Sequence, residues 1–397
     1  MNELRRISEK IFQNERLTRD DGLILLQCND LTYLSMLANH VRNRLHPNRY
    51  VSYIVDRNIN YTNVCSAGCY FCAFHCKPGS DSAFVLDKKT LAHKIEETKA
   101  LGGVQILLQG GLNPGLKIDW FEDLFRWIKE KHPIHIHGLS PPEILYIAKI
   151  SKLSVEETLL RLMDAGLDSI PGGGAEILVE DVRRKMNAHI KATAEEWLDL
   201  MRTAHSLGLL TTATMMFGAV ETPEDRLDHL LKIRDVQDQS AVVSRQSPNV
   251  VPAYRGRLPV ESSRSGFRKN RVYVGFTAFI PWVYQPDRTR LGGIKVSSFE
   301  YLKMVAISRL MLDNIPNIQA SWVTQGERIS QIALRFGCND LGSTMIEENV
   351  VAATGVKFSM TIEQMESIIW QSGYVPVQRN QTYEFLTSPG EECKIFM

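Results

Sequence analysis

The stretch of residues 63–74, NVCSAGCYFCAF, places Cys65, Cys69 and Cys72 at the spacing C-x3-C-x2-C, directly after a β-rich segment. An electron-transfer iron–sulfur cluster is normally held by four cysteine thiolates, so three thiolates leave one iron with open coordination positions. An open position on a metal is where substrate or cofactor chemistry takes place, as in catalytic zinc sites. The spacing therefore predicts a redox enzyme built around this loop.

A structural zinc site is the alternative for the same loop. Cys76 extends the run to C-x3-C-x2-C-x3-C, and four cysteines could fill a tetrahedral site. Structural zinc sites more often pair two short cysteine motifs across a longer loop. We therefore interpret Cys76 as lying outside the metal site, because a fourth ligand would close the open iron position.

Short apolar strands alternate with helices along the rest of the chain, and Gly or Pro ends most of the helices. The expected strands are residues 50–56 with 59–64, then 104–109, 135–139, 167–170, 211–218, 276–282, 317–322 and 338–344; the expected helices are 88–101, 120–131, 155–165, 194–207, 223–237, 298–312 and 326–336. This alternation predicts an α/β protein with a parallel sheet. About eight βα units would close a TIM-type (β/α)8 barrel. A doubly wound open sheet is the alternative, although no G-x-G-x-x-G turn follows the first strand.

Three further segments flank or interrupt the barrel. Residues 1–49 have helical spacing of Leu and Ile, with Asp30 as an expected N-cap, and predict an N-terminal helical extension. The barrel is expected over residues 50–355, followed by a C-terminal helical cap over residues 356–397. Residues 240–274 form an insertion with seven Lys or Arg and one Glu, whose Ser, Pro and Gly content predicts a surface loop.

Composition limits the kind of partner. The 397 residues include 46 basic and 45 acidic side chains. The resulting net charge of +1 does not indicate electrostatic binding to nucleic acid or to a membrane surface. The seven cysteines do not form a secreted disulfide framework, and the N-terminus has no apolar signal-peptide core. We expect a cytoplasmic enzyme with a small-molecule substrate and no membrane span.

Polar and glycine-rich turns follow several of the predicted strands, and in a (β/α)8 barrel such turns converge on one mouth that carries the active site. Gln109, Gly110 and Gly111 follow one strand; a glycine pair there is often only a turn. Ser140 follows the next strand and either faces the site or caps a helix beginning at Pro141. Glu176 ends the run PGGGAE, where its carboxylate either binds a ligand or favours a helix N-terminus.

Other polar residues are expected inside the barrel. His135 and His137 alternate on one strand and are interpreted as packed, hydrogen-bonded residues, because no third metal ligand lies nearby. Thr212 and Thr214 share one strand face and are expected to line the interior. Asp340, in the last turn CNDLGST, is the carboxylate expected to face the mouth as a catalytic residue.

The cysteine spacing, with Phe71 directly before the third cysteine, resembles that of the radical S-adenosylmethionine (SAM) family. The resemblance implies a [4Fe-4S] cluster on Cys65, Cys69 and Cys72, with SAM bound to the open iron and cleaved to a 5′-deoxyadenosyl radical. It further implies that Phe71, Gln109–Gly111 and Ser140 contact SAM. By the same resemblance, Glu176 would bind the SAM ribose and Arg183 the SAM carboxylate. Glu176 is also, with Asp340, a candidate catalytic residue.

A narrower resemblance rests on QGGLNPGLKIDWFEDL, SPPE, PGGGAEIL, TTATMMFGAVETPEDRLDHL, PWVYQP and NDLGSTMIEENV. These segments are similar to the family of cyclic dehypoxanthine futalosine synthases, with aminofutalosine synthase as a relative. The resemblance implies a step of menaquinone biosynthesis: hydrogen abstraction from the ribose of dehypoxanthine futalosine, addition of the carbon radical to the carboxyphenyl ring, and loss of a proton and an electron.

The same resemblance implies an electron donor such as flavodoxin or ferredoxin. The basic insertion at residues 240–274 is the hypothetical docking patch for that donor, because its charge complements an acidic partner. Arg288 and Arg290 are candidates to pair with the substrate carboxylate, although arginines at such positions are more often solvated.

Overall fold

Parallel strands in sequence order form the centre of the protein. In this computed structural model, which describes residues 2–246 and 274–387, one sheet has the order β2-β3-β4-β5-β6-β7-β8. Its neighbouring strands all pair in parallel. The strands are β2 (Asp56–Asn60), β3 (Gln105–Gln109), β4 (His135–Gly138), β5 (Ser169–Ile170), β6 (Leu210–Phe217), β7 (Gly275–Val283) and β8 (Asn317–Ile318).

Strand β9 (Asp340–Ser343) closes the ring between β8 and β1 (Tyr50–Ile54). Gln319, directly after β8, bridges to Asp340, and β9 pairs in parallel with β1. β1 continues through Val55 into β2, so β1 and β2 act as one bent strand. With that strand counted once, eight strand positions close a barrel. This arrangement confirms the predicted TIM-type fold and rules out the open doubly wound sheet.

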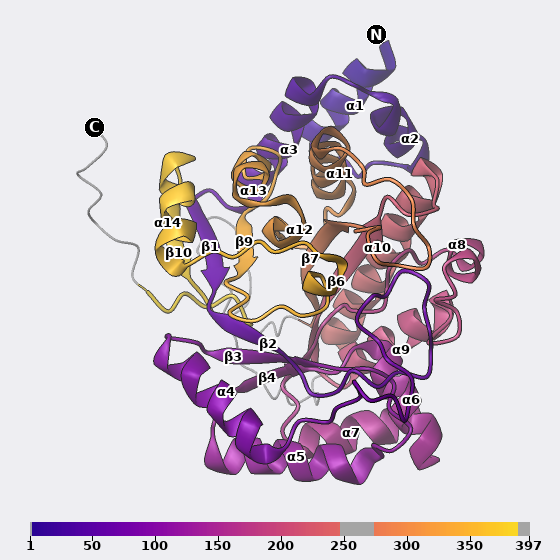
Figure 1. Ribbon diagram of the computed structural model, residues 1–397. Helices are drawn as coiled ribbons and strands as arrows, with labels where there is room; N and C mark the ends of the chain where they lie inside the picture. The colour runs from indigo at the N-terminus through magenta and orange to yellow at the C-terminus, as the bar shows by residue number, and fades with distance from the viewer. Residues whose placement is uncertain (1, 247–273, 388–397) are drawn as a thin grey trace.

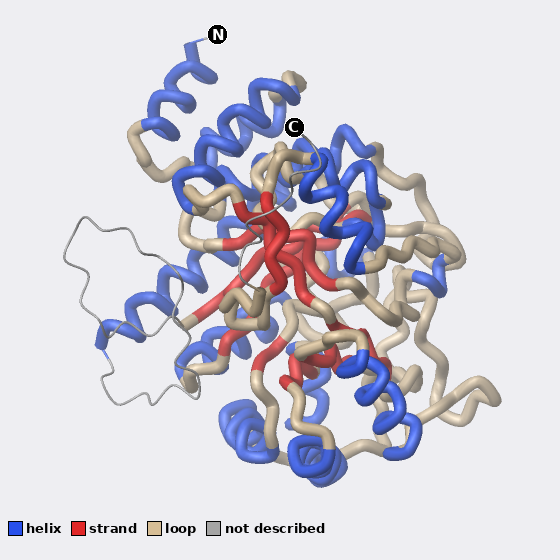
Figure 2. The backbone as a smooth tube through the Cα atoms, turned by 90° about the vertical axis from the view of Figure 1, so that its left-hand side faces the viewer, coloured by secondary structure: helices blue, strands red, loops and turns tan. Residues whose placement is uncertain are grey.

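Helices surround the strands on the outside (Figures 1 and 2). The helix α5 illustrates why: its buried residues Phe121, Leu124, Phe125 and Ile128 recur at helical spacing and form one apolar face toward the sheet. The crossover helices are α4 (Lys88–Ala100), α5 (Ile118–Lys131), α6 (Pro141–Ser151), α7 (Val155–Ala165), α9 (Ala194–Ser206), α10 (Pro223–Gln246), α11 (Ser298–Met311), α12 (Trp322–Gln325) and α13 (Glu327–Ala333), with the short α8 (Glu180–Lys185) in the loop after β5.

Side-chain caps fix where several of these helices begin. Each cap oxygen accepts a hydrogen bond from a backbone N–H of the first turn, which typically stabilises a helix by about 1 kcal/mol. The capping residues are Asp87 for α4, Ser154 for α7, Thr193 for α9 and Ser297 for α11. The loops that follow the strands gather on the right of Figure 2, which is the face turned to the viewer in Figure 1. That face is the mouth of the barrel.

The N-terminal segment is helical, as expected. It contains α1 (Asn2–Phe12), α2 (Arg19–Gln27) and α3 (Leu31–Leu45), and Asp30 caps α3 by accepting the Tyr33 N–H at 2.9 Å. α3 packs against α11, and α2 against α10 and α11. The domain boundaries at residues 49 and 355 stay predictions.

The C-terminal segment differs from the helical cap expected for residues 356–397. After the one-turn η1 (Ala352–Thr354) it contains the helix α14 (Ile362–Gln371), and then the strand β10 (Val375–Gln378), which pairs in parallel with β1. Because β3 pairs with β2 and not with β1, the neighbouring edge of β1 is left open for another strand. The pairing brings the residues after β10 toward the barrel.

The expected insertion is only partly described. Residues 247–273 lie outside the described residues, and with them most of the predicted docking loop. The helix α10 continues through Gln246, so the expectation of irregular chain from residue 240 is wrong for its first turns. The end of α10 and the start of β7 lie at the opposite end of the barrel from the mouth, since crossover helices run antiparallel to the strands they join. No described helix is long and apolar enough to cross a membrane.

Candidate active site

The three cysteines of the loop after β2 lie together at the mouth. Cys65, Cys69 and Cys72 belong to one small packed group, which the side chains of Ala67, Phe71, Leu112 and Tyr146 complete. The Asn187 side chain holds the loop by donating to the Ala67 and Gly68 carbonyls, at 3.4 and 3.0 Å. The loop therefore has a defined shape in which all three sulfurs share one apolar surrounding.

The chemistry of this group suits a metal cluster. Burial raises the pKa of the Cys69 thiol to about 12, and the nearby Lys191 ammonium opposes that rise. A buried thiolate is therefore formed most readily when a metal ion supplies the compensating charge. Cys76 is not part of the packed group; its backbone pairs with Asn63 and Cys65.

The turn after β3 approaches the cysteine loop so closely that it requires glycine. A Cβ added to Gly111 would lie 2.7 Å from the Val64 carbonyl carbon and 2.8 Å from Cys65 Cβ. Glu143 fixes the same turn, because its buried carboxylate accepts the Gly110 N–H and the Tyr61 hydroxyl, each at 2.8 Å. The turn therefore lies directly against the start of the cysteine loop.

The PGGGAE turn after β5 also lies near the cysteine loop, through Lys191, and holds a buried carboxylate. Glu176 has φ of 40°, in the left-handed region, and one carboxylate oxygen, Oε1, accepts a hydrogen bond from Lys191 Nζ at 2.6 Å. The other oxygen, Oε2, is buried and has no hydrogen-bond partner. Lys191 Nζ also lies 5.0 Å from the centre of the Phe71 ring. An unpartnered buried oxygen beside the cysteines fits a ligand that donates hydrogen bonds, such as a ribose diol.

Two residues expected to contact the cofactor instead support the turns. Arg183 is fully buried and donates its guanidinium hydrogens to the carbonyls of Gly174, Ala175 and Ala192, so it is not free to bind a carboxylate. Ser140 caps α6: its N–H and hydroxyl both donate to Glu143 Oε2, at 2.8 and 2.6 Å. Both predictions of direct contact are corrected accordingly, because backbone carbonyls already bind the Arg183 guanidinium and the Glu143 carboxylate already binds the Ser140 hydroxyl.

A cavity of about 280 Å³ extends from these turns into the barrel. Gln109, Gly173 and Glu176 line the end next to the cysteine loop. Thr212 and Thr214 also line it, as expected, and their hydroxyls bond the Gly172 N–H and carbonyl at 2.9 and 2.7 Å. The remaining lining includes Ile54, Asp56, Asn58, Gln105, Leu107, His137, Ile280, Trp282, Gln319, Trp322, Leu341, Ser343, Met345, Glu348, Val350, Arg379 and Gln381.

The histidine pair is hydrogen-bonded in the interior, as expected. His135 Nε2 and His137 Nδ1 each lie 2.7 Å from Ser169 Oγ. Burial lowers the pKa of His135 to about 4 and that of His137 well below 6.5. His137 also lines the cavity, where it is a neutral group.

Asp340 does not face the mouth, which corrects the prediction of a catalytic role. Its fully buried carboxylate pairs with Arg379, with Nε–Oδ2 at 2.5 Å and Nη2–Oδ1 at 3.0 Å, and also accepts the Ser52 hydroxyl. Asp340 is absent from the cavity lining, whereas Arg379 belongs to it. The cause is the pairing of β10 with β1, which brings Arg379 against the start of β9.

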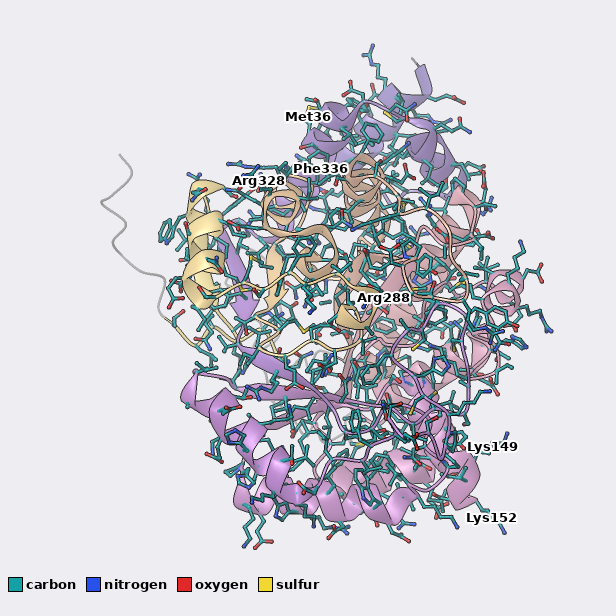
Figure 3. All side chains as sticks on the ribbon, in the orientation of Figure 1. Met36, Lys149, Lys152, Arg288, Arg328 and Phe336 are labelled. Atoms are coloured by element: carbon teal, nitrogen blue, oxygen red, sulfur yellow. The ribbon has the colours of Figure 1, made fainter. Side chains whose placement is uncertain are left out.

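The two arginines proposed for a substrate carboxylate are exposed. Arg288 lies over the mouth in Figure 3, near Gly355, and neither Arg288 nor Arg290 lines the cavity. The Arg290 guanidinium packs on the Tyr70 ring at 4.4 Å from its centre.

Several residues that line the cavity or lie next to the cysteine loop were not predicted from the sequence. Asp56 and Asn58 were detectable, because they occupy alternate positions of a strand with Asn60, and side chains at alternate positions share one face. Lys191 and Arg379 come from irregular segments, and no periodic pattern marks them. Their positions depend on contacts with residues far away in the chain.

Two family profiles match the chain. One, described as the radical SAM superfamily, covers residues 59–233, and the other, the CofH/MqnC C-terminal region, covers residues 273–392.

Named relatives match over nearly the whole length. The chain is 41% identical to cyclic dehypoxanthine futalosine synthase of Halalkalibacterium halodurans, covering 96% of this chain and 94% of the relative. It is 35% identical to aminodeoxyfutalosine synthase of Thermus thermophilus, covering 95% and 94%. It is 36% identical to 5-amino-6-(D-ribitylamino)uracil–L-tyrosine 4-hydroxyphenyl transferase of Methanococcoides burtonii, covering 95% and 98%.

Among solved structures, methylornithine synthase (PylB) is similar in fold, with a TM-score of 0.66 at 18% identity over 93% of this chain and 97% of that chain.

Proposed function

The chain belongs to the radical SAM enzymes, in the family of cyclic dehypoxanthine futalosine synthase and its relatives, and from this premise we propose that it cyclises dehypoxanthine futalosine in menaquinone biosynthesis. The observation that supports radical chemistry is the convergence of the cysteine loop, the Gln109–Gly111 turn and Glu176 at one end of the cavity. The choice of cyclase rests on identities of 41% and 38% to two enzymes of that name, against 35% and 36% for relatives with other names.

The residues at the mouth have distinct proposed roles. Cys65, Cys69 and Cys72 hold a [4Fe-4S] cluster and leave one iron for SAM. When bound, cluster and SAM supply a 5′-deoxyadenosyl radical by one-electron cleavage of the sulfonium. The Gly110 and Gly111 carbonyls accept hydrogen bonds from the methionine ammonium group.

Glu176 receives the ribose of SAM through its unpartnered Oε2, and Lys191 keeps that carboxylate ionised and oriented. Phe71 covers the Lys191 side chain on the side of the cysteine loop. Arg183 and Ser140 act indirectly by holding the two turns.

The electron donor is proposed to be a small carrier such as flavodoxin or ferredoxin, and the basic insertion at residues 240–274 stays the proposed docking patch, of which residues 247–273 lie outside the described residues. Deleting residues 247–273 should slow reduction by such a carrier and weaken its salt dependence. Unchanged rates would contradict this proposal. We also propose a cytoplasmic location, in keeping with the six described cysteines, all of which are free thiols.

An anaerobic assay tests the function. Reconstituted protein would be incubated with SAM, a reductant and dehypoxanthine futalosine, and the products measured by mass spectrometry. We expect 5′-deoxyadenosine and a product lighter than the substrate by two hydrogen atoms. Parallel reactions with tyrosine plus 5-amino-6-(D-ribitylamino)uracil test the second candidate function, which the 36% identical relative supports. Turnover of that pair without cyclisation of dehypoxanthine futalosine would overturn the proposal.

A further inference from the structure

The cavity has two chemically different walls. Strands β2, β3 and β4 supply polar side chains, including Asp56, Asn58, Gln105 and His137. The opposite wall, from β7 to the segment after β9, supplies the large apolar side chains Ile280, Trp282, Trp322, Leu341 and Met345, interrupted by smaller numbers of polar groups such as Gln319 and Ser343. A substrate that contains a sugar and an aromatic ring would bind most tightly when its ring packs on the apolar wall and its hydroxyls form hydrogen bonds with the polar wall.

Asp56 lies where the two walls meet. Ser343 Oγ–H donates to the Asp56 carboxylate, and the Ser343 carbonyl accepts the Trp322 indole N–H at 2.9 Å. One residue of β9 thus joins the carboxylate to the aromatic wall. The Asp56 carboxylate therefore lies next to the apolar surface that would receive the ring.

A second observation points to a ligand at the same place. Gln105 Nε2 donates to the other Asp56 oxygen at 2.5 Å, while Gln105 Oε1 is buried without a hydrogen-bond partner in the cavity lining. Gln105 as a whole is 2% exposed. A buried amide oxygen of this kind is normally satisfied, so it marks a position for a donor such as a substrate hydroxyl.

The other carboxylates that the described residues place in the lining are engaged differently. Glu176 is paired with Lys191 at 2.6 Å. Glu348 accepts the backbone N–H groups of Val350, Val351 and Ala352, each at 2.9 Å. Each Asp56 carboxylate oxygen accepts one side-chain hydrogen bond, from the Ser343 hydroxyl and the Gln105 amide respectively. Each oxygen therefore keeps a lone pair that can accept a proton. Burial also raises the pKa of Asp56, which helps it retain a proton once received.

We propose that the Asp56 carboxylate is the base that removes the aryl proton during ring closure, an inference that rests on the proposed function. The sugar carbon radical forms the new C–C bond to an aryl carbon, and the C–H bond at that carbon then breaks. The proton goes to Asp56, and the remaining electron passes to a one-electron acceptor of the iron–sulfur class. His137 is less available as a base, because both of its ring nitrogens already have partners: Ser169 Oγ at 2.7 Å and Gln381 Nε2 at 3.5 Å.

The test separates hydrogen abstraction from ring closure. In Asp56→Asn, formation of 5′-deoxyadenosine from dehypoxanthine futalosine should continue, while the cyclic product falls by about 10²–10⁴-fold, the range typical of a lost general base. The matched control is Asp164→Asn, which removes an exposed carboxylate that does not line the cavity, and for which the ratio of the two products should stay that of the native chain. If folded Asp56→Asn protein gave the two products in the same ratio as the native chain, the proposal would be overturned.

Chemical rescue covers the case in which Asp56→Asn does not fold. Asp56→Ala removes the carboxylate and leaves space, so added formate should restore cyclic product without changing the yield of 5′-deoxyadenosine. No increase with formate would also overturn the role of Asp56. Failure of the native chain to form any cyclic product would instead refute the proposed function itself, so the two failures are distinguishable.

Discussion

Replacing Asp340 with asparagine tests whether this carboxylate acts in the structure or in the chemistry. The change keeps the shape of the side chain and removes its charge. Asp340 is 0% exposed and accepts two hydrogen bonds from Arg379, one from Ser52 and one from the Gly342 N–H at 2.6 Å. An amide cannot accept all of these bonds, so Arg379 would be left as a buried charge without its partner.

The expected cost follows from that unpaired guanidinium. Removing one partner of a buried ion pair typically lowers the free energy of unfolding by about 3–5 kcal/mol. The double variant Asp340→Asn/Arg379→Met removes both charges and should recover a large part of the loss, since neutral replacements of buried pairs are often tolerated. The loss is specific to the buried pair. The exposed pair Arg126–Asp164, at 3.0 Å with side chains 54% and 77% exposed, should cost less than about 1 kcal/mol when Asp164 is replaced with asparagine.

Urea unfolding followed by circular dichroism gives the free energies, with Asp164→Asn as the control. The ratio of cyclic product to 5′-deoxyadenosine would be measured in the same samples below the transition. A stability of Asp340→Asn within about 1 kcal/mol of the native chain would refute the structural assignment. So would native stability combined with loss of cyclic product, which would restore Asp340 as a catalytic residue.

Three further outcomes follow from the structure. Gly111→Ala should lower the iron bound after reconstitution, measured by iron analysis, because the new Cβ would press on Cys65; full iron content would contradict this. Lys191→Met should weaken SAM binding in calorimetry more than Lys191→Arg does, since only arginine keeps the charge beside Glu176; equal affinities would contradict it. Below pH 6.5 the free energy of unfolding should fall by up to about 1.4 kcal/mol per pH unit for each buried neutral histidine, because the unfolded state gains protons that the folded state excludes until its pKa is reached. Urea titrations between pH 7 and pH 5 test this, and a flat profile would contradict it; burial lowers the pKa to about 3 in each of His46, His205 and His229.

The barrel could be predicted from sequence because its signals are local. Each βα unit carries its own apolar strand, helical spacing and a Gly or Pro near its end, and a count of such units indicates closure. Helix α4 illustrates the accuracy: residues 88–101 were expected and Lys88–Ala100 are observed. The strand β10 was not expected, because a four-residue strand has little pattern of its own and forms against an edge that only the barrel creates.

The site was less predictable because its charges are paired over long separations. Asp340 and Arg183 have charged groups that could act at the mouth of the barrel, yet each is already bound to a partner that no local sequence pattern specifies. Asp340 pairs with Arg379, and Arg183 donates to carbonyls of the PGGGAE turn. Polar residues in a buried strand were the better guide. Asp56 and Gln105, which share a register in the β2–β3 pairing, both line the cavity.

The division of the cavity between the two matched profiles indicates where specificity resides. The radical SAM profile, residues 59–233, contains the cysteine loop, both glycine turns, and Gln105 and His137 of the polar wall, whereas Asp56 and Asn58 precede it. The C-terminal profile, residues 273–392, contains Trp282, Trp322, Arg379 and Gln381. Relatives named for three different reactions match this chain over nearly its whole length, so the common radical-forming end cannot by itself distinguish their substrates. We therefore expect the discriminating contacts to include lining residues of the second half of the barrel. The pairing of β10 with β1 contributes to this lining, because Arg379 and Gln381 lie just after β10.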